Sequence, residues 1–214
     1  FGDVRIDGAL LQDAATSIDL AAGKTLTFGP SASTSLARGL WNGGGTVVNQ
    51  GTLATSGGTT NAGVLATSGT LSGGLTNQAS GQVQASGTVS GAIANAGLFT
   101  VTGALAGNGT LSNTGTAQLL VTGGSLTGLT SVTNSSTNAT GIGIGAGRTL
   151  AAGTVTNAAG ATLVSRVDGD HWETRDVVGL ASSIGFDALG VDLAMADLDE
   201  VLAWAQEGYL RTDG

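Results

Sequence analysis

The chain has 214 residues, 41% of them hydrophobic, and a formal net charge of −8. That length and hydrophobic content are enough to bury a core, which excludes disorder caused by low hydrophobicity and high charge. The composition excludes three further classes: it lacks the clustered Lys and Arg of a nucleic-acid surface, a run of about 18 apolar residues that could span a membrane, and any Cys for disulfide or thiolate chemistry.

Charge is unevenly distributed along the chain. Residues 1–38 mix Asp with Lys and Arg, residues 39–165 carry Arg148 alone, and residues 166–214 carry eleven of the fifteen acids. The Gly- and Thr-rich repeat described below also stops where that last segment begins. We therefore predict two parts, a solenoid with N-terminal entry turns over residues 1–165 and an acidic, partly α-helical segment over residues 166–214.

A short frame of the form Gly-x-apolar-x-Asn recurs along the solenoid segment. Its seven copies end on Asn residues spaced by 12, 16, 18, 18, 21 and 23 positions, which is near twenty with some slack. The copies are GTVVN (45–49), GGTTN (57–61), GGLTN (73–77), GAIAN (91–95), GTLSN (109–113), TSVTN (130–134) and GTVTN (153–157). Such a period, made of short alternating segments and Gly, Asn or Ser turns, is typical of stacked β-coils.

Alternation within the segments predicts which side chains face the core. In LFTVTG (98–103), Phe99 and Val101 share one face. Leu98 and Thr100 share the other. A coil cannot bury its apolar row alone, but stacking on neighbours about 4.8 Å away completes both the backbone hydrogen bonds and the core. The predicted fold class is all-β, a parallel β-helix or β-solenoid, and spacings up to 23 favour the right-handed form over left-handed coils with a six-residue count.

The repeated Asn residues have two interpretations. Asn tolerates the left-handed backbone at a corner and can hydrogen-bond its counterpart in the next coil, so these residues could form a structural ladder. The alternative is a simple preference of Asn for turns. The candidate ladder consists of Asn49, Asn61, Asn77, Asn95, Asn113, Asn134 and Asn157. The missing charge fits the same stacking, because a charge repeated in every coil would lie about 5 Å from its copy and repel it.

Two further stretches carry a resemblance to a known class of proteins. LAAGKTL (20–26) and IGAGRTL (144–150) share one pattern, and they occur beside runs such as GTLSNTGT and GTVTNAAGATL. This combination resembles the passenger regions of bacterial autotransporters and related exported adhesins, over roughly residues 15–165. The resemblance implies a right-handed parallel β-helix that is secreted or displayed at the bacterial cell surface for adhesion, aggregation or biofilm formation.

The acidic segment contains one clear helix pattern. DLDEVLAWAQEGYL (197–210) predicts a helix with Asp197 as its N-cap, Glu200 as the capping-box partner and Gly208 as its C-terminal stop. A solenoid must cover its last coil, because an open end exposes strand edges and core. Capping is therefore the expected role of the segment. Docking to a partner or to a second copy is the alternative.

Few residues could carry chemistry. In DGDHWE (168–173), the side chains of Asp168, Asp170, His171 and Glu173 could bind a divalent cation, although the spacing matches no EF-hand loop and a polar turn is the simpler interpretation. Polysaccharide-cleaving β-helices cluster carboxylates on their coils, which these coils lack, so we predict neither enzymatic activity nor a cofactor. Trp41 could pack over the side of the solenoid or stack on a sugar.

The sequence favours a structural and adhesive function. The expected protein is an exported β-helical stalk that presents Thr, Ser, Asn and Gln to other copies of itself, to a host surface, or to a glycan or other polymer. A phage or virus fibre segment is a close alternative, distinguished by its trimeric state. An ice-binding solenoid needs aligned Thr-x-Thr pairs in successive coils, and Thr25/Thr27 and Thr100/Thr102 have no matching ladder in the sequence. A polysaccharide-active enzyme is the last alternative.

Overall fold

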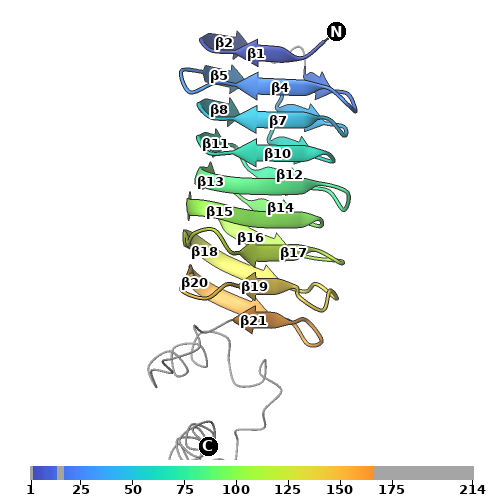
Figure 1. Ribbon diagram of the computed structural model, residues 1–214, viewed down its shortest axis with the longest axis vertical. Coiled ribbons are helices and arrows are strands. Elements are labelled where there is room, and N and C mark those ends of the chain that lie inside the picture. Colours follow the sequence, from blue (N-terminus) through green and yellow to red (C-terminus); the bar gives the residue numbers. More distant parts are fainter. Residues whose placement is uncertain (1, 14–16, 166–214) are drawn as a thin grey trace, which may run out of the picture. The chain divides into compact units, whose positions relative to one another are not determined.

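The computed structural model describes residues 2–13 and 17–165, which form 21 β-strands and, within those ranges, no helix (Figure 1). The strands wind into about eight stacked turns, each of which contributes a strand segment to three sides of the coil. We call these sides A, B and C in the order in which the chain visits them. The predicted all-β parallel solenoid is confirmed.

Most strands belong to a single side. On side A lie β1 (Val4–Ile6), β4 (Thr25–Phe28), β7 (Thr46–Asn49), β10 (Val64–Thr67), β17 (Gln118–Val121), β19 (Ile142–Ile144) and β21 (Leu163–Ser165). On side B lie β2 (Ala9–Gln12), β5 (Ser33–Leu36), β8 (Thr52–Thr55) and β11 (Thr70–Ser72). On side C lie β3 (Ile18–Leu20), β6 (Leu40–Asn42), β9 (Thr59–Asn61), β12 (Leu75–Asn77), β14 (Ile93–Asn95) and β16 (Thr110–Asn113).

Four longer strands continue from one side to the next. Strands β13 (Gln82–Ser90) and β15 (Leu98–Gly107) run from side A to side B, and β18 (Leu126–Asn134) and β20 (Leu150–Asn157) run from side B to side C. All the strand pairings are parallel and join neighbouring coils, as in Leu75↔Ile93 of β12 and β14, and the register shifts at one point in each of the pairs β13–β15 and β18–β20. Strand edges are therefore paired along the length of the column, and unpaired edges remain only at its ends.

The core is a set of apolar columns that run along the coil axis. On side A, each inward side chain stacks on its partner in the next coil, and the members are Leu26, Val47, Leu65, Val83, Phe99, Leu119 and Ile142. All of these side chains are buried. The alternation predicted for β15 is confirmed, because Phe99 and Val101 are buried while Leu98 and Thr100 are half-buried on the outer face.

The first coil is less well packed than those that follow. Its inward residues are only partly buried against the core, and they are Ile6, Leu10, Ile18 and Leu20. Val4, which is in register with the inward Leu26, is 47% exposed, and Leu11 on the outer face of side B is 84% exposed. The interior is therefore completed from the second coil onwards, where Phe28 and Leu36 are fully buried.

Several predictions fall outside the described residues. The boundary at residue 165, the acidic segment 166–214 and its helix with Asp197, Glu200 and Gly208 belong to this group, and they stay predictions. Within the described ranges, no helix is long and apolar enough to cross a lipid bilayer.

Candidate functional site

A ladder of asparagine side chains runs down the inside of side C. Each residue occupies the last position of its strand, and each Nδ2 donates a hydrogen bond to the Oδ1 of the Asn in the following coil. The bonds are Asn42 to Asn61 (2.7 Å), Asn61 to Asn77 (2.9 Å), Asn77 to Asn95 (2.8 Å), Asn95 to Asn113 (2.7 Å), Asn113 to Asn134 (3.0 Å) and Asn134 to Asn157 (2.7 Å). The first six of the seven side chains are buried.

The Nδ2 group of each asparagine also donates to backbone carbonyl oxygens. Nδ2 of Asn77 also lies 3.2 Å from the carbonyl oxygen of Gly81 and 3.1 Å from that of Leu98. At the start of the ladder, Oδ1 of Asn42 accepts a bond of 2.8 Å from the Gly45 backbone N–H. Because these buried amides find their partners within the coils, the ladder fixes coil register and turn shape, and it offers no free group to a ligand.

The predicted ladder was wrong at Asn49. This residue lies on side A, where it is in register with Phe28 above and Thr67 below. Its Nδ2 donates to Oγ1 of Thr67 (3.1 Å) and to the backbone oxygen of Thr70 (3.0 Å), whereas its buried Oδ1 finds no partner among the described residues. The position in the ladder belongs to Asn42.

The spacing of the asparagines in the sequence already indicates that Asn42, and not Asn49, precedes Asn61 in the ladder. Asn49 and Asn61 are only 12 positions apart, too few for a full coil, whereas Asn42 and Asn61 are 19 apart. The frame itself does not distinguish sides, because β7 and β20 end on the same residue pattern while lying on sides A and C respectively. The remaining six predicted asparagines all lie on side C.

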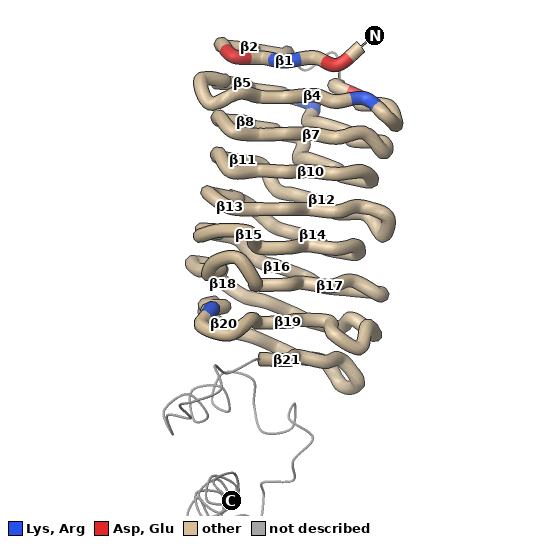
Figure 2. The backbone as a smooth tube through the Cα atoms, in the orientation of Figure 1, with Lys and Arg blue, Asp and Glu red and all other residues tan. Residues whose placement is uncertain are grey.

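Charged side chains of the described residues gather in the first two coils (Figure 2). They are Asp3, Arg5, Asp7, Asp13, Asp19, Lys24 and Arg38, and the next charged residue along the chain is Arg148. Arg5 donates a hydrogen bond of 2.7 Å to Asp7, and this bond and the nearby carboxylate charge raise the pKa of the Arg5 guanidinium. The outer surface from residue 39 to residue 147 is therefore neutral.

Hydroxyl groups line the outer face of side B over four successive coils. One column contains Ser33, Thr52, Thr70 and Thr88, and the parallel column contains Ser35, Ala54, Ser72 and Ser90. Side C carries a second array in three later coils, made of the pairs Thr110/Ser112, Ser131/Thr133 and Thr154/Thr156. The expectation that Thr25/Thr27 and Thr100/Thr102 have no matching ladder is confirmed, because Thr27 is in register with Val48 and Thr100 with Gln84 and Leu120. The aligned hydroxyl groups on sides B and C combine Ser with Thr, a pattern that the Thr-x-Thr criterion does not include.

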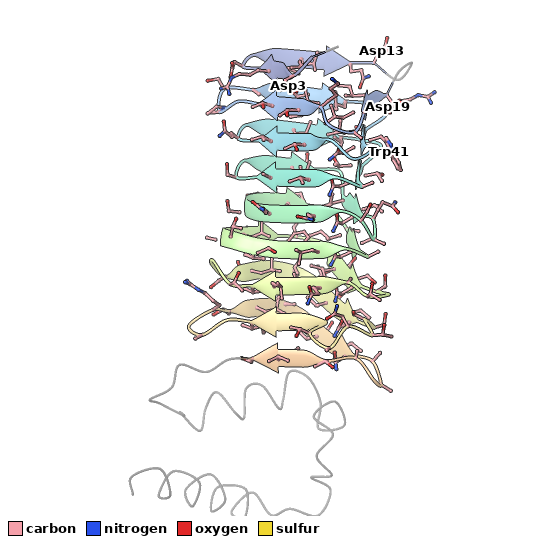
Figure 3. All side chains as sticks on the ribbon, turned by 45° about the vertical axis from the view of Figure 1, so that its right-hand side comes forward. Asp3, Asp13, Asp19 and Trp41 are labelled. Carbon is pink, nitrogen blue, oxygen red and sulfur yellow. The ribbon has the colours of Figure 1, made fainter. Side chains whose placement is uncertain are left out.

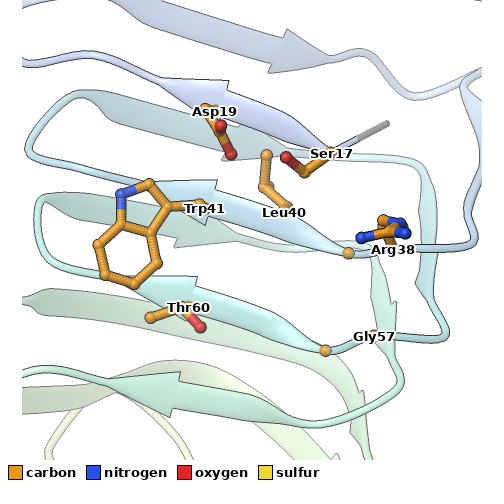
Figure 4. Close-up of a pocket in the computed structure, with 9 residues that line it drawn as sticks. Ser17, Asp19, Arg38, Leu40, Trp41, Gly57 and Thr60 are labelled. Carbon is orange, nitrogen blue, oxygen red and sulfur yellow. The ribbon is translucent and has the colours of Figure 1, made fainter. Parts of the chain in front are cut away.

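A depression in the described surface lies at the N-terminal end of side C (Figure 4), near which Figure 3 labels Asp19 and Trp41. Its volume is about 440 Å³. Its lining residues are Ser17, Asp19, Arg38, Gly39, Leu40, Trp41, Gly57, Gly58 and Thr60. Trp41 is 45% exposed and lies in register between Asp19 of the coil above and Thr60 of the coil below. This arrangement places an aromatic face between a carboxylate and a hydroxyl.

The predicted metal ligands are not tested by this structure. Asp168, Asp170, His171 and Glu173 lie outside the described residues. Over residues 2–13 and 17–165, no three His, Asp or Glu side chains come close enough together to hold an ion.

The geometry defines the class of protein as a parallel β-solenoid. A comparison with protein-family models found no match, and searches of curated proteins and of solved structures found none either. The resemblance to autotransporter passengers therefore contributes an expectation about function, and the fold itself rests on the coil geometry described above.

Proposed function

We propose that the chain is a structural and adhesive stalk segment of an exported, cell-surface protein. The proposal is carried by one observation, the long uncharged surface whose outward Ser and Thr side chains repeat from coil to coil. On side B this repeat continues through β5, β8, β11 and β13. The exported location comes from the resemblance of the repeats to bacterial adhesin passengers.

The mechanical part of this function follows from the coil stack. Parallel pairing ties each coil to its neighbours, and the Asn ladder adds a side-chain bond at every step on side C from Asn42 to Asn157. A quasi-one-dimensional array of this kind holds its binding groups at fixed intervals of about 4.8 Å. Such a column can carry a distal binding region away from a surface.

The adhesive part follows from the chemistry of the sides. Hydroxyl groups both donate and accept hydrogen bonds, so a column of them can pair with an identical column or with a hydroxyl-rich polymer. Because residues 39–147 carry no charge, a side-to-side contact between these coils brings no like charges together at the contact itself. Many weak contacts at a regular spacing add up through multivalency. Adhesion of this type should depend little on salt, because it does not rely on ion pairs.

Beads coated with the full chain provide a direct test. We expect coated beads to cluster, and clustering to change less than about twofold between 50 mM and 500 mM NaCl, which spans most of the range of ionic screening. The variant Thr52→Lys/Thr88→Lys places two positive charges on side B, two coils apart. It should abolish clustering.

The matched control places the same charges on the outer face of side C. Thr76→Lys/Ser112→Lys also sets two positive charges two coils apart, but on side C. If the side C control variant still clusters and the side B variant does not, the contact between chains lies on side B. Beads that stay dispersed with the parent chain, or that cluster equally with both variants, contradict the proposed adhesion.

A second candidate function has its own observation. The three hydroxyl pairs on side C, Thr110/Ser112, Ser131/Thr133 and Thr154/Thr156, form a regular grid that could order water. Regular hydroxyl grids of this kind are what ice binding requires of a solenoid. Thermal hysteresis of the purified chain tests this candidate: a freezing-point gap that Thr133→Lys removes supports ice binding, and the absence of a gap rules it out.

A further inference from the structure

We propose that the depression around Trp41 binds one neutral hexopyranose unit of a polysaccharide. The inference rests on the adhesive function proposed above, for which it names one class of ligand and one site. The site lies on side C of the first three coils and is formed by β3, β6 and β9 (Figure 4).

Exposure of the indole is the first observation. The described coils bury nearly all of their large apolar side chains, and beside Trp41 only Val4, Leu11 and Val164 stay exposed. Trp41 projects from the flat outer face of side C rather than from a loop. One open aromatic face on a flat sheet matches the apolar C–H face of a pyranose ring, which stacks on the negative face of the π-system.

The polar rim is the second observation. The carboxylate of Asp19 lies on one side of Trp41, and the hydroxyl of Thr60 lies on the other, each one coil away. The guanidinium of Arg38 lies at the opposite end of the depression from the indole. These groups surround the ring edge of a stacked sugar, where its hydroxyls project. A carboxylate accepts hydrogen bonds from sugar hydroxyls, and a guanidinium donates to sugar oxygens.

The volume of the depression is large enough for one hexopyranose unit. Its volume of about 440 Å³ falls within the range of roughly 300–1,000 Å³ that is usual for small-molecule sites. Gly39, Gly57 and Gly58 form part of its lining, so backbone makes up this part of the wall. The depression is open to solvent along side C, which lets a polymer chain pass through it.

Charge decides between neutral and acidic sugars. The lining contains one carboxylate, Asp19, and one guanidinium, Arg38, so its formal charges cancel. Because Asp19 is in register with Trp41, a uronate ring stacked on the indole would place its own carboxylate near that of Asp19. Like charges at this separation repel. The geometry therefore favours an uncharged hexose over a uronic acid.

Affinity electrophoresis of the full chain provides the test. Native gels each contain one soluble polymer, and the set comprises four neutral hexose polymers (dextran, laminarin, mannan and galactan) and one acidic polymer (polygalacturonate). We expect at least one neutral polymer to retard the chain. Trp41→Ala should weaken that binding at least tenfold, and Asp19→Asn should weaken it about threefold to tenfold.

Two further variants separate sugar binding from general loss of structure. Leu11→Ala removes another exposed apolar side chain from the first coil, on side B, and should leave the retardation unchanged. Trp41→Phe keeps an aromatic face and should retain part of the binding. Circular dichroism and thermal unfolding verify that each variant folds. If Trp41→Ala fails to fold, Asp19→Asn and Trp41→Phe still decide the question.

Three outcomes would overturn the sugar site: no neutral polymer retards the chain, Trp41→Ala binds as the parent does, or polygalacturonate alone is bound. The bead experiment distinguishes this failure from failure of the stalk proposal. Beads that cluster through side B while no polymer binds leave the adhesive stalk standing without the Trp41 site. Dispersed beads together with retardation that depends on Trp41 support the sugar site and reject self-adhesion.

Discussion

The side chain of Asn95 donates a hydrogen bond of 2.7 Å to that of Asn113, which lies at the same strand position one coil further along. Asn95 in turn accepts from Asn77 and donates to the backbone oxygen of Gln118 at 3.0 Å. One buried amide thus connects three coils. Its removal leaves the buried Oδ1 of Asn113 without its donor and Nδ2 of Asn77 with one acceptor fewer, which makes it a sensitive position in the column.

Replacing Asn95 by Ala should therefore lower the free energy of unfolding by about 1–3 kcal/mol, the cost of leaving buried polar groups unpaired. Urea denaturation followed by circular dichroism measures the change. Asn108→Ala is the matched control, since Asn108 is exposed and accepts a single bond, from the Gly91 N–H. A loss at Asn108 equal to that at Asn95 would show that the ladder contributes nothing beyond ordinary turn preference.

The side A core column makes a second prediction. Phe99 is fully buried and stacks between Val83 and Leu119. Phe99→Ala should cost about 3–5 kcal/mol, because it removes apolar contacts and leaves a cavity between two coils. Val4, in the same column but 47% exposed in the first coil, provides the comparison. Val4→Ala should cost less than about 1 kcal/mol. Equal losses in denaturation experiments would be inconsistent with a shared interior.

Asn49 and Thr67 make a third prediction. They form a buried polar pair in a column that is otherwise apolar from Phe28 to Val121, and Oδ1 of Asn49 has no partner among the described residues. The double variant Asn49→Val/Thr67→Val replaces both polar partners by apolar groups of similar size. Its free energy of unfolding should lie within about 1 kcal/mol of the parent value, or above it.

Each single change at this pair should cost more than the double change. Asn49→Val removes the donor to Thr67 and Thr67→Val removes the acceptor, so either one leaves a buried group with fewer bonds. A double-mutant cycle measured by urea denaturation gives the coupling. Additive losses from the two substitutions would mean that the pair does not interact as the structure shows.

The coil corners make a fourth prediction. Gly73 has a φ of 102°, and a Cβ there would collide with the backbone oxygen of Thr55 in the preceding coil. Gly73→Ala should cost more than about 3 kcal/mol, since left-handed backbone strain and a backbone clash add. Gly115 has a φ of 65° with nothing near its would-be Cβ. Gly115→Ala should cost about 1–2 kcal/mol from strain alone. Similar melting temperatures for the two variants would contradict close coil stacking at Gly73.

Much of this architecture is predictable from the sequence because each coil repeats the same local chemistry. The alternation in β15 indicates correctly that Phe99 and Val101 face inward, and the Asn frame marks six of the seven ladder positions. A side-chain pattern with period two specifies which face is buried. It does not specify which of the three sides a strand occupies.

That missing information explains the error at Asn49 and the failure to recognise two surface features. The hydroxyl columns of side B depend on register between coils, and they combine Ser33 with Thr52, Thr70 and Thr88 although the chain lengths between them differ. The depression at Trp41 depends on three residues from three coils. The sequence identified Trp41 as a candidate sugar-stacking residue, but nothing in it aligned Asp19 and Thr60 with the indole.

The central claim is that consecutive coils lie directly on one another in register, and distances between spin labels test it most directly. One outer column on side A contains Thr27, Thr100, Leu120 and Val164. Along this column, Thr100 lies four coils from Thr27, Leu120 lies five coils from it, and Val164 lies seven coils from it. Because the chain has no Cys, pairs of introduced cysteines can be labelled selectively. The Cα separations from Thr27 should be roughly 19, 24 and 34 Å, at about 4.8 Å per coil, and the spin–spin distances from double electron–electron resonance should increase in the same order and by similar steps. Separations that do not rise with coil number would contradict the stacked column.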